Sequence, residues 1–196
     1  DIDEKVKRVL RAKYQYGLAN LQLINTNNLV EDLNKDIPTL RRRVAEEALT
    51  LVRNDHPAIF PLQPGTNRRV AYVAIGTDQD NALAERLRKD YRAHVYFFNS
   101  KMDENTANAL TQFMIGQYDV VIAGVHAYNR TPAKNFGLNP AGLHLLQHLK
   151  DNIPTITVFF GNPYAIGNSC DSKVLIAAYD NDPITQETAA DLISGR

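Results

Sequence analysis

The sequence predicts an open, doubly wound α/β fold: a mostly parallel sheet of about five strands with helices on both faces, a three-layer sandwich. Five short apolar runs alternate with segments of helical periodicity. The runs are typical of strands covered on both faces and lie at 70–76, 95–98, 119–125, 155–160 and 173–179. With 196 residues, the chain is too short for a closed (β/α)₈ barrel, which needs about 250.

The N-terminal part is expected to be organised differently. Residues 1–17 are predicted to form an amphipathic helix, because apolar residues recur at helical spacing from Val6 to Tyr14 and a glycine follows. Residues 18–38 are rich in Asn and Asp and have weak periodicity, which indicates a connector with one helical turn. The α/β domain then takes residues 39–196.

An apolar stripe after Pro38 predicts a helix that continues to Val52. The stripe consists of Leu40, Val44, Ala48, Leu51 and Val52. Three consecutive arginines at 41–43 suggest a phosphate or nucleic-acid patch, but Glu46 and Glu47 lie one turn further on and neutralise it. A solvated helix face is therefore favoured for the arginines.

Polar residues at the ends of the predicted strands are interpreted first as helix caps. Asp78, Asp103, Asn139 before Pro140, and Asp182 before Pro183 stand where a helix would begin. Carboxylates at these ends also suit acid/base chemistry; they are Asp78, Asp80, Asp103, Glu104, Asp180 and Asp182. Because an acidic group in the first turn stabilises a helix, capping is favoured over catalysis.

Composition excludes several classes of partner. Lys+Arg and Asp+Glu each number 22, so the formal net charge is 22 − 22 = 0, and no electrostatic attraction to nucleic acid or an anionic membrane is expected. The apolar runs are too short to span a bilayer. The single Cys170 permits no internal disulfide, and a role for it as a nucleophile is disfavoured.

Known cofactor motifs are absent from the sequence. The first predicted strand ends at Gly76 without the further glycines of a dinucleotide fingerprint, and no GxxxxGK[ST] loop or GxSxG elbow is present. His144 and His148 have the four-residue spacing of a two-histidine metal face, but they lack a third ligand at a motif spacing. Solvent-facing histidines are favoured, and neither a metal nor a cofactor is expected.

The loop after the third predicted strand, residues 126–137, is the strongest candidate for function. It gathers an imidazole, two cations, amides and two aromatic rings at the carboxyl end of a strand, where ligands of such sheets bind. Candidates for a substrate cleft or a domain interface are His126, Tyr128 and Arg130 from this loop, with Asn162 and Tyr164 from the turn after the fourth strand. A loop packed on itself accounts for the same residues equally well.

Several segments resemble glycoside hydrolase family 3. Residues 1–18 (DIDEKVKRVLRAKYQYGL) are similar to the segment that closes the catalytic barrel of that family, and residues 45–54 (AEEALTLVRN) to the helix that opens its second domain, an α/β sandwich. Residues 152–164 with 179–181 resemble later strands of that domain. The segment 132–137 (PAKNFG) is most similar to the β-N-acetylhexosaminidase branch.

The resemblance implies a parent enzyme that hydrolyses terminal β-linked N-acetylglucosamine, or a related β-glycoside, with retention. The family's aspartate nucleophile and the His-Asp acid/base pair of this branch lie on the barrel. No glutamate follows the third or fourth predicted strand to replace them, so no catalytic residue is expected in this chain. Its expected partners are the missing N-terminal barrel of the same polypeptide and, through it, a carbohydrate.

The resemblance carries two further expectations. The family's domain usually has another strand after its last helix, and its absence here would leave a sheet edge exposed and invite self-association. Family habit also favours a periplasmic or secreted enzyme, although no signal peptide opens this chain. The alternatives are a self-sufficient flavodoxin-like module that binds a small molecule or nucleotide, and a domain that serves only in assembly.

Overall fold

A computed structural model describes residues 1–20, 22, 24–126, 129, 131–133 and 135–196. Contacts divide the chain into two units, residues 1–38 and residues 39–196. In the described part of the chain, no helix is long and apolar enough to cross a membrane.

The first unit is helical. It contains α1 (Ile2–Gln15), the 3₁₀ helix η1 (Leu18–Asn20) and α2 (Leu29–Asn34). Asp1 caps α1, and its side chain accepts from the Asp3 amide. No residue of α1 is buried, so its apolar face remains exposed within this unit.

The second unit is built on a six-stranded sheet with the order β1-β6-β5-β4-β2-β3. The strands are β1 (Thr50–Asn54), β2 (Val70–Ile75), β3 (His94–Phe98), β4 (Val120–Val125), β5 (Thr155–Phe159) and β6 (Val174–Ala177). β2 to β6 pair in parallel, which confirms the predicted α/β class, and β1 pairs antiparallel with β6.

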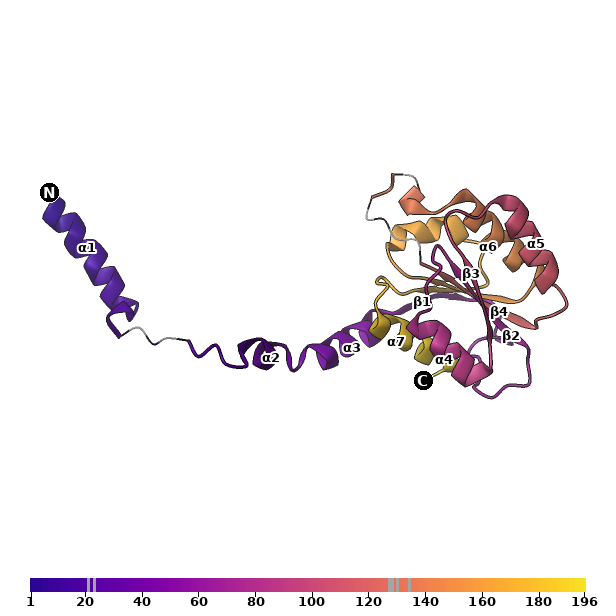
Figure 1. The fold of residues 1–196 in the computed structure, drawn as a ribbon, viewed down its shortest axis with the longest axis horizontal. Helices are drawn as coiled ribbons and strands as arrows, with labels where there is room; N and C mark the ends of the chain where they lie inside the picture. Colours follow the sequence, from indigo (N-terminus) through magenta and orange to yellow (C-terminus); the bar gives the residue numbers. More distant parts are fainter. Residues whose placement is uncertain (21, 23, 127–128, 130, 134) are drawn as a thin grey trace. The chain divides into compact units, whose positions relative to one another are not determined.

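Helices cover both faces of this sheet (Figure 1). α4 (Ala82–Tyr91) and α7 (Pro183–Ser194) contact each other on one face, and α5 (Glu104–Met114) and α6 (Pro140–Asn152) contact each other on the opposite face. The remaining helices are α3 (Ile37–Ala48) and the 3₁₀ helices η2 (Asn135–Gly137) and η3 (Pro163–Ser169). Alternate residues of each strand face the two helical layers, which accounts for the continuous apolar runs.

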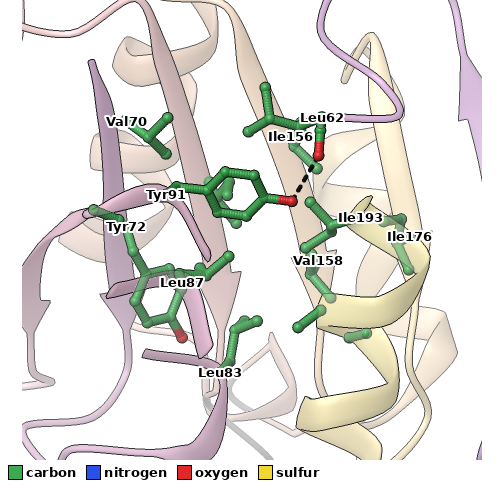
Figure 2. Close-up of a cluster of buried hydrophobic side chains, with 14 of the residues drawn as sticks. Leu62, Val70, Tyr72, Leu83, Leu87, Tyr91, Ile156, Val158, Ile176 and Ile193 are labelled. Carbon is green, nitrogen blue, oxygen red and sulfur yellow. Dashed lines mark hydrogen bonds between the residues drawn. The ribbon is translucent and has the colours of Figure 1, made fainter. Parts of the chain in front are cut away.

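The layer between the sheet and α4/α7 is a close-packed apolar core (Figure 2). Leu83 and Leu87 of α4 and Ile193 of α7 are fully buried against β-branched residues of the central strands. The ring of Tyr91 lies among them, and its hydroxyl donates to the Leu62 carbonyl at 2.6 Å. This bond satisfies the one polar group that the tyrosine brings into the core.

Two sequence-based expectations are wrong at the start of the domain. The helix predicted to reach Val52 ends at Ala48, and Thr50–Asn54 is the edge strand β1. Leu51 is 38% exposed, so the apolar stripe did not indicate a buried helix face there. The buried strand β6 would otherwise present an unpaired edge, and pairing it outweighs the local helical pattern.

The helix start predicted at Asp78 is also displaced. α4 begins after Asn81, whose side chain accepts from the Ala84 amide at 2.9 Å. Asp80 instead pairs with Arg88 of the helix. The caps predicted at Asp103, Asn139 and Asp182 are confirmed.

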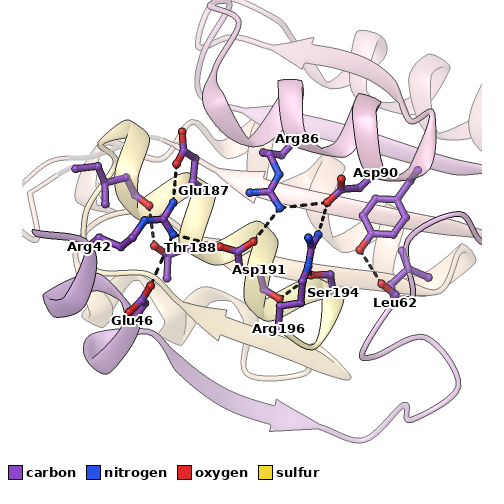
Figure 3. Close-up of polar contacts among 12 residues, drawn as sticks. Arg42, Glu46, Leu62, Arg86, Asp90, Glu187, Thr188, Asp191, Ser194 and Arg196 are labelled. Atoms are coloured by element: carbon purple, nitrogen blue, oxygen red, sulfur yellow. Dashed lines mark hydrogen bonds and ion pairs between the residues drawn. The ribbon is translucent and has the colours of Figure 1, made fainter. Parts of the chain in front are cut away.

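Ion pairs hold α3 against α7 (Figure 3). Arg42 contacts Glu187 at 2.9 Å and Asp191 at 3.4 Å, besides Glu46 of its own helix. Arg41 pairs with Asp182 at 2.7 Å. Arg41 and Arg43 are exposed, as the predicted solvated face requires, and Arg42 is half-buried. The ion pairs of Arg41 and Arg42 were not predicted, because they depend on the topology that brings α7 beside α3.

The ion-pair network extends from α7 to α4 and the C-terminus. Asp191 also accepts from Arg86 of α4 at 2.8 Å, and Asp90 accepts from both Arg86 and Arg196. Asp90 keeps only 12% of its side chain exposed, so solvent screens its pairs less than those of a free surface residue.

Candidate functional site

The carboxyl ends of β2 and β4 form the switch point of this sheet, because the chain leaves β2 in one direction to β3 and then returns to its other side with β4. A cavity of about 240 Å³ opens there, on the face covered by α5 and α6. Open α/β sheets bind ligands at this position. The cavity is therefore the natural candidate for a binding site.

The cavity has an apolar floor and an amide-rich rim. Its lining residues are Ile75, Gly76, Phe98, Asn99, Ser100, Val125, His126, Gly137, Leu138, Asn139, Gly142 and Leu143. Histidine is the only titratable type among them. Gly142 lets α6 approach the sheet, since a Cβ at this position would lie 2.9 Å from Cγ2 of Ile75.

His126 directly follows β4 and is one of the residues that line the cavity. Its ring, however, packs against Phe160, a residue of the core on the other face of the sheet, beneath α4 and α7. It is only 6% exposed. Its Nδ1 is 2.7 Å from Oδ1 of Asn181, and its Nε2 is 2.5 Å from the Tyr72 hydroxyl. The imidazole also stacks on Phe160, with ring centroids 4.7 Å apart.

These contacts fix the tautomer of His126. The amide oxygen of Asn181 only accepts, so Nδ1 carries the proton and donates, and Nε2 accepts from the Tyr72 hydroxyl. Gln186 orients the amide by donating to the same Asn181 oxygen at 2.9 Å. The network therefore joins β2, β4 and the start of α7.

Burial keeps this imidazole neutral. Desolvation lowers the pKa of His126 to about 4, and the hydrogen bond to Asn181 opposes this shift. Burial also raises the pKa of the Tyr72 hydroxyl. A general base that works near neutral pH needs a pKa close to that pH and access to substrate, and His126 has neither.

Gly124 provides the space for the Tyr72–His126 pair. A Cβ at this position would lie 2.7 Å from the Tyr72 hydroxyl and 2.9 Å from Nε2 of His126. These distances are shorter than van der Waals contact, so any larger residue would push the two rings apart.

The other predicted site residues lie at the same edge or outside the described residues. Asn162 follows β5 and caps η3, with its side chain accepting from the Tyr164 amide at 3.0 Å. Tyr164 is 81% exposed. Because β4 pairs with β5, these two residues and His126 share one edge of the sheet. Tyr128 and Arg130 lie outside the described residues.

Comparisons with known proteins concern the fold. No family model matches the sequence, and no curated protein is significantly similar to it. Solved structures do match. A glycoside hydrolase family 3 β-N-acetylglucosaminidase from Paenibacillus sp. str. FPU-7 has 20% identity and a TM-score of 0.62, over 99% of this chain and 37% of that chain.

Two further structures agree. A β-glucosidase from Listeria innocua, solved with isofagomine, has 19% identity and a TM-score of 0.67, over 98% of this chain and 30% of that chain. A fungal multi-domain family 3 β-N-acetylglucosaminidase has 20% identity and a TM-score of 0.64, over 89% of this chain and 19% of that chain. The chain has the fold of a glycoside hydrolase family 3 domain. It spans between 19% and 37% of the length of these enzymes.

In this family 3 fold, the described residues contain no group of three or more His, Cys, Asp or Glu side chains placed to hold a metal. His144 and His148 were predicted to face solvent but are half-buried; their ring centroids lie 4.0 Å apart, and Nε2 of His144 is 2.9 Å from Oδ1 of Asn108. Cys170 is exposed, as a loop cysteine.

Sequence reasoning missed the partners of His126 in the family 3 fold. Tyr72 was assigned only to a strand, and Asn181 and Gln186 were not singled out as site residues. The signal available was a histidine directly after an apolar strand, a position that is usually buried. A buried histidine needs hydrogen-bond partners; Asn181 follows β6 at the same edge and could be sought there, whereas Tyr72 lies inside β2.

Proposed function

We propose that this chain is the non-catalytic second domain of a retaining glycoside hydrolase acting on β-N-acetylglucosaminides or β-glucosides. Support comes from the fold, which matches part of such enzymes over 98–99% of this chain. In this proposal, residues 1–17 are the end of a catalytic barrel, residues 18–38 are a connector, and the barrel is the partner of the α/β domain.

The chemistry at the sheet edge agrees with a supporting role. Retaining hydrolysis needs a carboxylate that attacks the sugar and an acid/base group, which is a His-Asp pair in the branch that this chain resembles. The cavity at the switch point has no carboxylate among its described lining residues. His126 is neutral, enclosed and bonded at both nitrogens, so it links β2 and the segment before α7 to the end of β4 rather than exchanging protons with a substrate. In this proposal Tyr164 contacts a sugar at the rim of the cleft, and its exposure leaves the ring free for such a contact.

The proposal is tested by assaying the 196-residue chain on p-nitrophenyl N-acetyl-β-glucosaminide and p-nitrophenyl β-glucoside. No turnover is expected from the chain alone. In an enzyme that joins this domain to its barrel, Tyr164→Ala is expected to raise KM and leave kcat nearly unchanged, because a rim contact adds to binding in ground and transition states alike. Turnover by the isolated chain that a substitution within it abolishes would overturn the proposal.

The cavity itself favours a second candidate, a module that binds a small molecule without any barrel. The lining residues that the structure describes are uncharged, which suits a small neutral molecule. The two functions are separated by the change in melting temperature of the isolated chain with millimolar glycerol, glucose and N-acetylglucosamine. A saturable increase that Gly142→Val removes supports the binding module, since the added side chain would enter the cavity.

A further inference from the structure

A second cavity lies at the opposite edge of the sheet, where β2, β3 and β4 begin. It has a volume of about 440 Å³. Its described lining includes Arg68, Arg69, Arg92, His94 and Gln117, and no carboxylate. In a chain of zero net charge, three guanidinium groups around one cavity are a local excess of positive charge.

One of the three arginines is already paired. Arg69 forms a two-point contact with Asp119, with Nη2 at 2.7 Å from Oδ1 and Nε at 3.3 Å from Oδ2. These hydrogen bonds lower the pKa of Asp119 to about 2. Arg68 and Arg92 form no ion pair with any of the residues that the structure describes. Two guanidinium groups therefore remain without a carboxylate in direct contact.

A chain of ring hydrogen bonds adds a donor beside them. The Tyr96 hydroxyl contacts the Tyr118 hydroxyl, which lies 2.7 Å from Nδ1 of His94. When Tyr118 donates to Nδ1, the imidazole proton is on Nε2, the nitrogen that Tyr118 does not contact. His94 is exposed, so this second nitrogen can meet a ligand.

The backbone at Arg92 is unusual for an arginine. It ends α4 with φ at 54° and ψ at 34°, in the left-handed region where glycine is usual at the end of a helix. An arginine in this conformation costs stability relative to glycine. Glycine would adopt this conformation at lower cost, so the position allows the contribution of the arginine side chain to be tested separately from the helix end.

A purely structural role is the competing interpretation, because cations near the carboxyl end of a helix stabilise its dipole. Three carbonyls near the end of α4 already accept backbone hydrogen bonds: those of Leu87 and Arg88 from the Arg92 amide, and that of Asp90 from the Gly65 amide. The guanidinium group is therefore not needed as a hydrogen-bond donor to these three carbonyls.

We infer that this cavity binds a tetrahedral oxyanion, a phosphate or sulfate group, carried on a small polar molecule. Arg68 and Arg92 supply paired donors of the geometry that such oxyanions prefer, and His94 adds a third. The cavity is much larger than the anion, and Gln117, Asn67 and Thr66 line the remaining space with polar groups. The inference is independent of the proposed glycosidase role, which concerns the other edge of the sheet.

The experiment is an NMR titration of the ¹⁵N-labelled 196-residue chain with inorganic phosphate, inorganic sulfate, glucose 6-phosphate and glucose at constant ionic strength. Saturable shifts are expected for the amides of residues 66–69, 92–94 and 117–118 with all three anions and not with glucose. Arg68→Gln and Arg92→Gly are each expected to weaken binding about tenfold. The matched control is Arg43→Gln, which removes an exposed arginine from α3.

Arg92→Gly separates binding from structure. If the arginine is retained for a ligand, this variant loses binding while its melting temperature stays the same or rises by a few degrees, because glycine relieves the left-handed conformation. A lower melting temperature together with unchanged anion shifts would overturn the inference. Shifts spread over the whole surface, or equal weakening in Arg43→Gln, would also overturn it. If the dissociation constants for phosphate and sulfate differ by tenfold or more, the tighter one identifies the oxyanion that the site prefers.

Discussion

The buried imidazole of His126 makes the stability of the domain depend on pH. In the unfolded chain the imidazole has its ordinary pKa of 6.5, and burial lowers the pKa to about 4 in the folded chain. Between these values the unfolded state binds a proton that the folded state does not. Stability contributed by the neutral group is thus present above pH 6.5 and is lost as the pH falls, by about 1.4 kcal/mol per unit and about 3 kcal/mol by pH 4.

His126→Gln removes this titration, and urea unfolding from pH 7.5 to 4 measures the result. At about pH 7.5 the variant is expected to be about 2 kcal/mol less stable, since it loses the stacking on Phe160 and one of two buried hydrogen bonds. The difference should shrink below pH 6.5 and vanish or reverse near pH 4, because only the wild type loses stability through this group. Carboxylates elsewhere titrate equally in both proteins, so their contributions cancel in the difference between the two free energies of unfolding.

The matched control is Phe160→Leu, which disturbs the same cluster and keeps the imidazole. It is expected to lower stability by about 1 kcal/mol at every pH, in parallel with the wild type. If the His126→Gln curve also runs parallel to the wild type between pH 6.5 and 4, the imidazole is not held neutral and the reasoning fails.

Three substitutions test the packing directly, each by urea or thermal unfolding. Gly124→Ala should lower the free energy of unfolding by about 2 kcal/mol, because its methyl group would lie 2.7 Å from the Tyr72 hydroxyl; an unchanged stability would mean that the rings move apart freely. Asp182→Ala should cost about 1 kcal/mol by removing the cap on the Thr185 amide together with the ion pair to Arg41, whereas Asp182→Asn should keep the cap and lose only the ion pair. Tyr91→Phe should cost about 1 kcal/mol by leaving a buried carbonyl unpaired, and no loss would show that water replaces the hydroxyl.

The sequence was most informative where local pattern and burial agree. The five parallel strands are apolar along most of their length because helices cover both faces, and few arrangements of secondary structure besides a covered parallel sheet produce such runs. The edge strand β1 carries a pattern shaped by partial exposure, and Leu51 and Val52 continue a helical stripe by coincidence of spacing. The conformation of β1 is decided by pairing with β6, and because β6 is far away along the chain, the local sequence does not reveal this pairing.

The candidate site shows the same limit. His126 could be found from its position after an apolar strand, but Tyr72 and Asn181 are 54 and 55 residues away along the chain. Strand order brings them together, and strand order was not predicted from the sequence. Gly142 likewise follows a helix start that was predicted, but its contact with Ile75 depends on how closely α6 approaches the sheet.

The contacts that hold α3 on the rest of the sandwich should depend on the salt concentration. Leu40 and Val44 are 60% and 58% exposed and only Ala45 of this helix is buried, so much of its contact with the domain consists of the ion pairs of Arg41 with Asp182, the cap of α7, and of Arg42 with Glu187. The Debye length, over which charges still interact, falls from about 10 Å at 0.1 M salt to about 3 Å at 1 M salt. The stabilisation from apolar burial is not weakened by a salt such as sodium chloride. At high salt concentration α3 should therefore detach from α7 first, while the sheet and the buried helices α4 to α7 stay folded.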